Sequence, residues 1–139
     1  MKRYLLLFSL LLLIACKGKL TEVAVNYFDD GTPHKVLYYD IKGRDSILVK
    51  SVEYHLNHTI YIEGFYKGEK PHGTWKSWHD NGNLWSIGSF KRGVQVGRSK
   101  VYHKNGNLYY SGHYDKRGKS TGTWKFYDEN KKLLQTVKY

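Results

Sequence analysis

The feature that most constrains this sequence is an internal repeat with a period of about 24 residues. NGNLWSIGSF at 81–90 and NGNLYYSGHY at 105–114 occupy the same register. Columns of equivalent residues extend that register along the chain, and the clearest of them runs Tyr54, Trp78, Tyr102 and Tyr127. A weaker copy lies upstream, near Tyr27. Self-similarity at a fixed period is the signature of a repeat architecture, in which one unit is too small to bury its own apolar face.

Each unit reads as two strands joined by a tight turn. GTWKSWH is followed by DNGN and then by LWSIGSF. Asn-Gly between apolar runs is a strong hairpin signal, so Asn81-Gly82 and Asn105-Gly106 predict type I′ turns. Asn57-His58 and Asn130-Lys131 are weaker versions of the same turn. The sequence therefore predicts an all-β fold: an elongated antiparallel meander of about five tandem β-hairpins in a twisted single sheet, over residues 22–139.

Strand alternation predicts which side chains share a face. Along 84–90, even-numbered residues should lie on one face and odd-numbered residues on the other. Trp75 and Trp78 are three residues apart, so either a bulge intervenes or both faces carry aromatic rings. We favour a face built from the columns of Trp78, Leu84 and Phe90. Gly88 and its equivalents should leave room for a ring from the next unit.

The pattern G-x-W-x-x-[WY]-x-x-NG-x-L-x-x-x-G-x-[FY] resembles the MORN-type repeat, in particular the bacterial variant often labelled the YwqK family. The resemblance covers residues 49–139 well and 22–48 poorly. It implies a ladder of β-hairpins. The sequence departs from the pattern at Ser51 and Ser99, which stand where other units carry Trp75 and Trp124. Atypical end units are usual in capped repeat arrays.

The N-terminus has the layout of an export signal. Lys2 and Arg3 precede an apolar run over 4–15, which is shorter than the roughly 20 residues a membrane-spanning helix needs. The run ends in LIAC at 13–16, which closely resembles the lipobox of bacterial lipoproteins. That resemblance implies a signal peptide over 1–15, acylation of Cys16 and a short tether over 16–21. The protein would then be lipid-anchored to a bacterial membrane of the cell envelope, inner or outer.

No motif predicts an enzyme, a metal site or a cofactor. His55, His79 and His103 form one column, but equivalent residues two strands apart lie roughly 10 Å from one another and cannot share an ion. His55 and His58 could approach each other but supply only two ligands. The run GKST at 118–121 lacks the first glycine and the following helix of a phosphate-binding loop. We expect exposed histidines and a non-catalytic protein.

The chain has a formal net charge of +11, and its basic residues concentrate in the repeats. Stacked hairpins should align several of them as one basic edge: Lys67, Lys91, Arg92, Lys116 and Arg117. One interpretation is solubility and protection of the sheet edges. The other is contact with anionic lipid headgroups. Nucleic acid is not an expected partner, because the repeat register already uses the aromatic residues and the signal predicts export.

Our favoured hypothesis from the sequence is a protein-binding or scaffold module of the cell envelope. Its contact surface would be a row of exposed aromatic side chains: Trp75, Trp85, Tyr109 and Trp124. Flat rings bury much area at low entropic cost, which suits an envelope protein or a glycan as partner. The alternatives are binding of anionic lipid and, because members of the YwqK family are often described as antitoxins, an antitoxin-like role. The sequence leaves the oligomeric state open.

Overall fold

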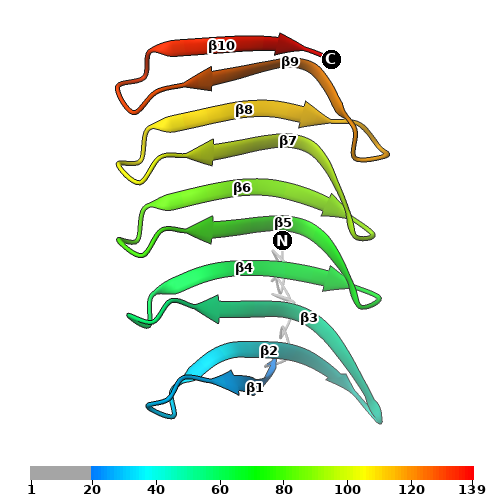
Figure 1. Cartoon of the computed structure of the whole chain (residues 1–139). Helices are drawn as coiled ribbons and strands as arrows, with labels where there is room; N and C mark the ends of the chain where they lie inside the picture. The colour runs from blue at the N-terminus through cyan, green and yellow to red at the C-terminus, as the bar shows by residue number, and fades with distance from the viewer. Residues whose placement is uncertain (1–19) are drawn as a thin grey trace, which may run out of the picture.

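The computed structural model describes residues 20–139, which form ten β-strands and no helix (Figure 1). The predicted signal peptide and Cys16 lie outside the described residues. The strands are β1 (Thr21–Tyr27), β2 (Pro33–Lys42), β3 (Asp45–Tyr54), β4 (Ile60–Lys67), β5 (Lys70–Trp78), β6 (Leu84–Lys91), β7 (Val94–Tyr102), β8 (Leu108–Tyr114), β9 (Ser120–Tyr127) and β10 (Leu133–Lys138).

All ten strands belong to one antiparallel sheet in which spatial order equals chain order. Figure 1 shows the chain rising as a meander, each strand beside its predecessor and its successor. The predicted all-β meander of hairpins is confirmed. With strands about 4.8 Å apart, the ladder is roughly 43 Å from β1 to β10.

The sheet is a single layer, so few side chains are fully enclosed. Among the described residues, the buried apolar side chains are Val36, Val52 and Trp124. Three serines are buried as well: Ser51, Ser77 and Ser99. No second sheet or helix covers either face of the described part of the chain. Each strand is therefore stabilised mainly by the two strands beside it.

The Asn-Gly turns differ from the predicted type. In β5–β6 the Gly82 N–H donates to the His79 carbonyl (2.9 Å), and the His79 N–H donates to the Asn83 carbonyl (2.9 Å). Gly82 has a positive φ of 84°, whereas Asn81 does not have a positive φ. This is a three-residue loop, a type I turn followed by a left-handed residue, and not the two-residue type I′ turn. His58 and Lys131 take the left-handed position in the units without Gly.

Type I′ geometry occurs at the opposite end of the sheet. Gly68-Glu69 and Arg92-Gly93 each have two consecutive positive φ values, and each pair joins directly opposed strand residues. Two left-handed residues between paired strands define the type I′ turn. The chain therefore alternates three-residue loops at one end of the sheet with shorter turns at the other, except for the longer β8–β9 loop.

A β-bulge in the second strand of each unit changes the predicted distribution of side chains. Ser77 pairs with Ser86 and Trp78 with Leu84, so Trp85 is an extra residue between two pairs. The extra residue in the other units is His34, Tyr61, Tyr109 or Leu134. We expected odd-numbered residues of 84–90 to share a face, and this was wrong for Trp85. The bulge turns Trp85 to the face of Ser86, where the two line one groove.

Glycines receive tryptophan rings between neighbouring units, as expected of a glycine that leaves room. A Cβ on Gly64 would lie 2.0 Å from Cδ2 of Trp75, and a Cβ on Gly112 would lie 2.0 Å from Cδ2 of Trp124. The rings are thus those of Trp75 and Trp124. They do not come from the Trp78 column, which alternation places on the opposite face from Trp75. The expected common face of the Trp78, Leu84 and Phe90 columns was therefore wrong, because Phe90 contacts Trp75 at 5.7 Å.

Candidate functional site

Two aromatic clusters lie on one face of the sheet. The first is centred on Trp75, whose ring is 5.4 Å from that of Tyr66 and 5.7 Å from that of Phe90. The second is centred on Trp124, which contacts three rings: Tyr110 at 5.7 Å, Tyr114 at 5.0 Å and Tyr139 at 5.9 Å. Such ring pairs stabilise the sheet beyond simple area burial. The two clusters are four strands apart, on β5 and β9.

Ser99 on β7 separates the two clusters. It occupies the repeat position of Trp75 and Trp124, and it faces Gly112 across β7–β8. No indole covers the neighbouring Gly88. Instead the Gln95 amide lies there, with Nε2 2.9 Å from the position a Cβ would take. Nε2 of Gln95 donates to Oγ of Ser99 (3.4 Å). A small residue at this one position leaves a gap between the clusters.

The gap forms part of a groove, which we call the aromatic groove. Two adjoining hollows make it up, and both are lined by Ile62, Ser86, Val101 and Tyr110. The larger has a volume of about 660 Å³, within the roughly 300–1,000 Å³ of ligand sites. Its walls and floor are as follows: Trp75 and Trp85 on one side, Tyr109 and Tyr110 on the other, and Ser77, Ser86, Gly88, Ser99 and Val101 beneath.

The four aromatic residues predicted from the sequence as a contact surface differ in their exposure. Trp85 and Tyr109 are 39% and 40% exposed and stand on opposite walls of the aromatic groove. Trp75 is half-buried and lines the same groove. Trp124 is only 5% exposed, because it covers Gly112, so it is unavailable to a partner. The bulge that aims Trp85 and Tyr109 into the groove was not located by sequence reasoning.

Histidines of one column connect successive units. Nε2 of His55, His79 and His103 donates to the carbonyl oxygens of Trp78, Tyr102 and Tyr127, at 2.8, 3.0 and 2.9 Å. Because a carbonyl only accepts, Nε2 must carry the proton. We expected solvent-exposed histidines, but these three are half-buried. Each ring also contacts the bulged aromatic of its own unit, as His79 does with Trp85 at 5.7 Å.

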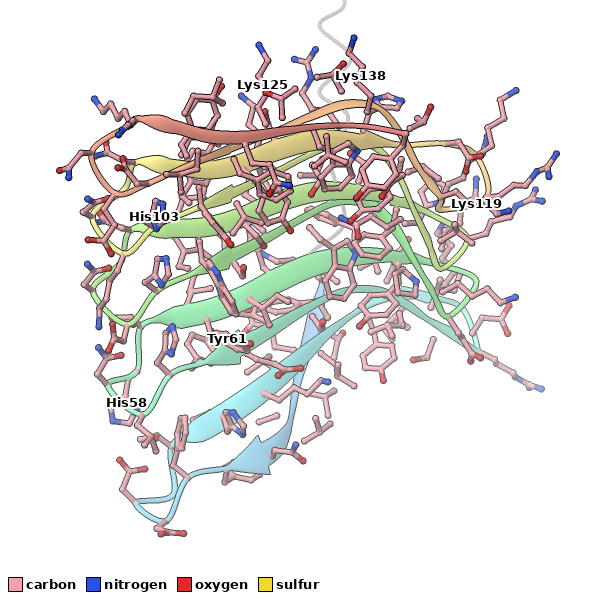
Figure 2. The ribbon with its side chains drawn as sticks, turned by 45° about the horizontal axis from the view of Figure 1, so that its top comes forward. His58, Tyr61, His103, Lys119, Lys125 and Lys138 are labelled. Atoms are coloured by element: carbon pink, nitrogen blue, oxygen red, sulfur yellow. The ribbon has the colours of Figure 1, made fainter. Side chains whose placement is uncertain are left out.

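Asparagines repeat this connection at the loops. Nδ2 of Asn57, Asn81 and Asn105 donates to the carbonyl one unit further on, at 2.7, 2.9 and 2.9 Å. The histidine and asparagine columns lie at the end of the sheet where Figure 2 labels His58 and His103. They fix the spacing of the units and so position the walls of the aromatic groove.

The basic edge predicted from the sequence lies at the other end of the sheet, near Lys119 in Figure 2. We call this end, formed by residues 42–45, 67–70, 91–94 and 115–119, the basic end. It carries nine basic side chains against three acidic ones. The five predicted residues, Lys67, Lys91, Arg92, Lys116 and Arg117, are all exposed. None of the five makes an ion pair within residues 20–139.

The described residues contain no group of three or more His, Cys, Asp or Glu side chains placed to hold a metal ion. Nor do they include a helix long and apolar enough to cross a membrane.

The β8–β9 loop contains a carboxyl group whose pKa is shifted, that of Asp115. The backbone N–H groups of Lys119 and Arg117 donate to the Asp115 carboxylate and lower its pKa from its usual value.

A single-layer ladder of aromatic β-hairpins defines the class of β-repeat proteins. Residues 71–92, 95–116 and 120–139 match the family model described as MORN repeat variant. The C-terminal half of the chain, over β5–β10, is therefore similar to MORN-type repeats. Repeats of this family are typically non-catalytic and are consistent with a protein- or lipid-binding module.

Comparisons with curated proteins and with solved structures indicate no further family. No curated protein matches the chain. One similar solved structure is the "Crystal structure of GtfA/B complex bound to UDP and GlcNAc", at 9% identity and a TM-score of 0.35. The similarity covers 86% of this chain and 24% of that chain. At that TM-score it supports no statement about fold or function.

Proposed function

We propose that this protein is a non-catalytic binding or scaffold module of the bacterial cell envelope, anchored by a lipid on Cys16. The aromatic groove is its binding surface. The observation that carries the proposal is the pair of exposed rings, Trp85 and Tyr109, on opposite walls of one groove. Two bulges in successive units aim these rings at the same space, although a regular strand would point them to the other face.

Three features of the groove support a binding role. Its walls are aromatic, and such rings dominate the energetics of binding sites. Its position is fixed by the inter-unit hydrogen bonds of His79 and His103, so little ordering is needed when a ligand arrives. It also interrupts the repeat at Ser99, where a tryptophan would have continued the aromatic packing.

A second candidate function is binding of anionic lipid by the basic end. The observation in its favour is the ratio of nine basic to three acidic side chains in turns that lie side by side. Each basic residue near an anionic membrane contributes about 1 kcal/mol. Binding of the protein to vesicles would then grow with their anionic lipid content and weaken with salt. A protein with K67E, K91E and K116E together should lose this binding and keep its fold.

The test of the groove is crosslinking in cells from a photoreactive residue at position 109 of the full-length protein. Tyr109 should give a covalent adduct. The same residue at position 27, where Tyr27 is 59% exposed on β1 and outside the groove, should not. Equal adducts from the two positions, or none from position 109, would contradict the proposal.

The anchor has its own control. In the Cys16→Ser protein, fractionation should move the chain out of the membrane fraction, and the adduct at position 109 should fall if the partner belongs to the envelope. A Cys16→Ser protein that stays in the membrane would contradict lipid anchoring and leave the groove proposal to the crosslink.

A further inference from the structure

We infer that the sheet has a further binding site, on the face opposite the aromatic groove, and that its ligand is a small molecule bearing a phosphate group. The site is a hollow of about 480 Å³ over β7, β8 and β9, which we call the cationic hollow. Its polar lining consists of Arg98, Lys100, Ser111, His113, Thr123 and Lys125. It is separate from both surfaces of the proposed function, the aromatic groove and the basic end.

Strand alternation and strand pairing bring these side chains together. Lys100 lies between Ser99 and Val101, which line the aromatic groove, so its side chain belongs to the other face. Lys100 pairs with Ser111, and Ser111 pairs with Lys125. The two lysines therefore flank one serine in a row that crosses three strands.

An arginine adds a further positive charge to the same face. Arg98 is two residues from Lys100 on β7, and it pairs with His113 on β8. Figure 2 shows Lys125 and Lys138 projecting from one side of the sheet. Three permanently charged side chains, Arg98, Lys100 and Lys125, thus surround one hollow.

No acidic side chain balances these charges within residues 20–139. The lining of the cationic hollow contains neither Asp nor Glu. None of Arg98, Lys100 and Lys125 forms an ion pair with another described residue. Like charges close together on one face destabilise a sheet. An anion bound between the three cations would remove this repulsion.

The equivalent positions two repeats upstream do carry an acid. There Lys50, Glu63 and Lys76 lie on three successive strands. Nζ of Lys50 lies 3.0 Å from Oε2 of Glu63, and Glu63 pairs with Lys76 across β4–β5. In the cationic hollow, Ser111 takes the place of Glu63 between the two cations. The repeat therefore keeps the cations here and omits the side chain that neutralises them.

A phosphate group suits this set of donors. The Arg98 guanidinium can bind an oxyanion through two parallel hydrogen bonds, and each lysine adds a compact positive charge. The hydroxyls of Ser111 and Thr123 can donate to further oxygens. A phosphate group carries nearly two negative charges near pH 7, so one group balances more than one cation. The volume of the hollow lies in the range of small-molecule sites.

The experiment is isothermal titration calorimetry of the detergent-solubilised full-length protein with inorganic pyrophosphate. One molecule should bind per chain at physiological salt, which screens scattered surface charges. Ser111→Glu restores the acid of the upstream unit and should weaken binding at least about tenfold. Its unfolding midpoint should stay the same or rise, because the new carboxylate would lie beside Lys100 and Lys125. R98A should also weaken binding.

Two controls separate the cationic hollow from the general positive charge of the protein. Ser46→Glu adds the same charge at an exposed position of β3, outside the hollow, and should bind pyrophosphate like the unaltered protein. The protein with K67E, K91E and K116E changes only the basic end and should also keep its pyrophosphate binding. Loss of binding in either control would overturn the inference.

The source of the phosphate is tested with vesicles that contain phosphatidylglycerol. Any binding of the protein to these vesicles should be the same for the S111E protein, because the hollow takes a small soluble ligand. Vesicle binding that falls together with pyrophosphate binding in S111E would assign the hollow to lipid headgroups. No saturable binding of pyrophosphate, several molecules bound per chain, or equal binding by a folded S111E protein would overturn the inference as well.

Discussion

At the scale of single residues, the sheet depends on contacts between a glycine and the aromatic ring of the next strand. Gly64 and Gly112 have no room for a methyl group, because the Trp75 and Trp124 indoles lie against them. At Gly88 the neighbour is the flexible end of Gln95. Equivalent glycines therefore differ in how strictly they are required.

Gly112→Ala should destabilise the protein by about 3 kcal/mol, because the buried Trp124 ring must shift from a closely packed position. Gly88→Ala is the matched control and should cost less than about 1 kcal/mol, since the Gln95 side chain can rotate away. Urea unfolding followed by tryptophan fluorescence measures both. Equal costs would refute the role given to the Trp124 ring.

The Asp115 carboxylate predicts a pH effect on stability. Its pKa is lowered in the folded protein, first by the Lys119 N–H and then by the Arg117 N–H. A lowered folded pKa contributes stability above the unfolded value of 3.8, and that stability is lost as pH falls through the folded pKa.

The prediction is tested with Asp115→Asn, which keeps the shape but lacks the charge-assisted bonds. Its urea midpoint should lie below that of the unaltered protein at pH 7, and the difference should shrink as pH falls from about 5. D45N, at the first residue of β3 in the basic end, is the control and should show a smaller difference. A constant difference for D115N would contradict the assignment.

At the scale of elements, the loops and bulges decide where side chains point. The left-handed position of each three-residue loop is Gly in three hairpin units, but His58 and Lys131 hold it in the other two. A non-glycine residue in this conformation costs about 1–2 kcal/mol.

Lys131→Gly should therefore stabilise the protein by up to about 1 kcal/mol, after the greater flexibility of glycine in the unfolded chain offsets part of the gain. Gly106→Ala, at the equivalent position with φ 85°, should destabilise it by about 1 kcal/mol. Chemical unfolding of both proteins gives the comparison. A loss of stability in K131G would contradict the loop geometry.

The sequence predicted the strands and hairpins correctly, but it did not predict the turn type or the bulges. Periodic aromatic residues and Asn-Gly pairs predicted the strands and hairpins, because those signals are local. The type of turn was predicted wrongly, since the same Asn-Gly pair suits a type I′ turn or the end of a three-residue loop. Alternation also placed Trp85 on the wrong face, because it assumes a regular strand and the bulge adds one residue.

The aromatic groove depends on one departure from the repeat pattern, Ser99. The departure was visible in the sequence, but its structural consequence was not predicted. Ser99 stood out as a missing tryptophan, yet its consequence depends on the three-dimensional neighbourhood of Gly88 and Gln95. The predicted basic residues do lie in turns or at strand ends on one end of the sheet, because strand order follows chain order. Their role, and lipidation at Cys16, stay predictions.

At the scale of the whole molecule, the ladder is one-dimensional, because each strand pairs only with its chain neighbours. Opening should begin at the two ends, where one side of the strand has no partner strand in the described part of the chain. Backbone amides of β1 and β10 should exchange with deuterium fastest, and those of β5–β8 slowest. Uniform exchange along residues 20–139 would indicate all-or-none unfolding and contradict this gradient.

The central claim is that the gap at Ser99 makes a binding groove between two aromatic clusters. The most direct measurement compares crosslinking in cells from position 109 in two full-length proteins that differ only at residue 99, one with Ser and one with Trp. We predict that the S99W protein keeps its unfolding midpoint and loses the adduct. An adduct of equal yield from a folded S99W protein would contradict the claim.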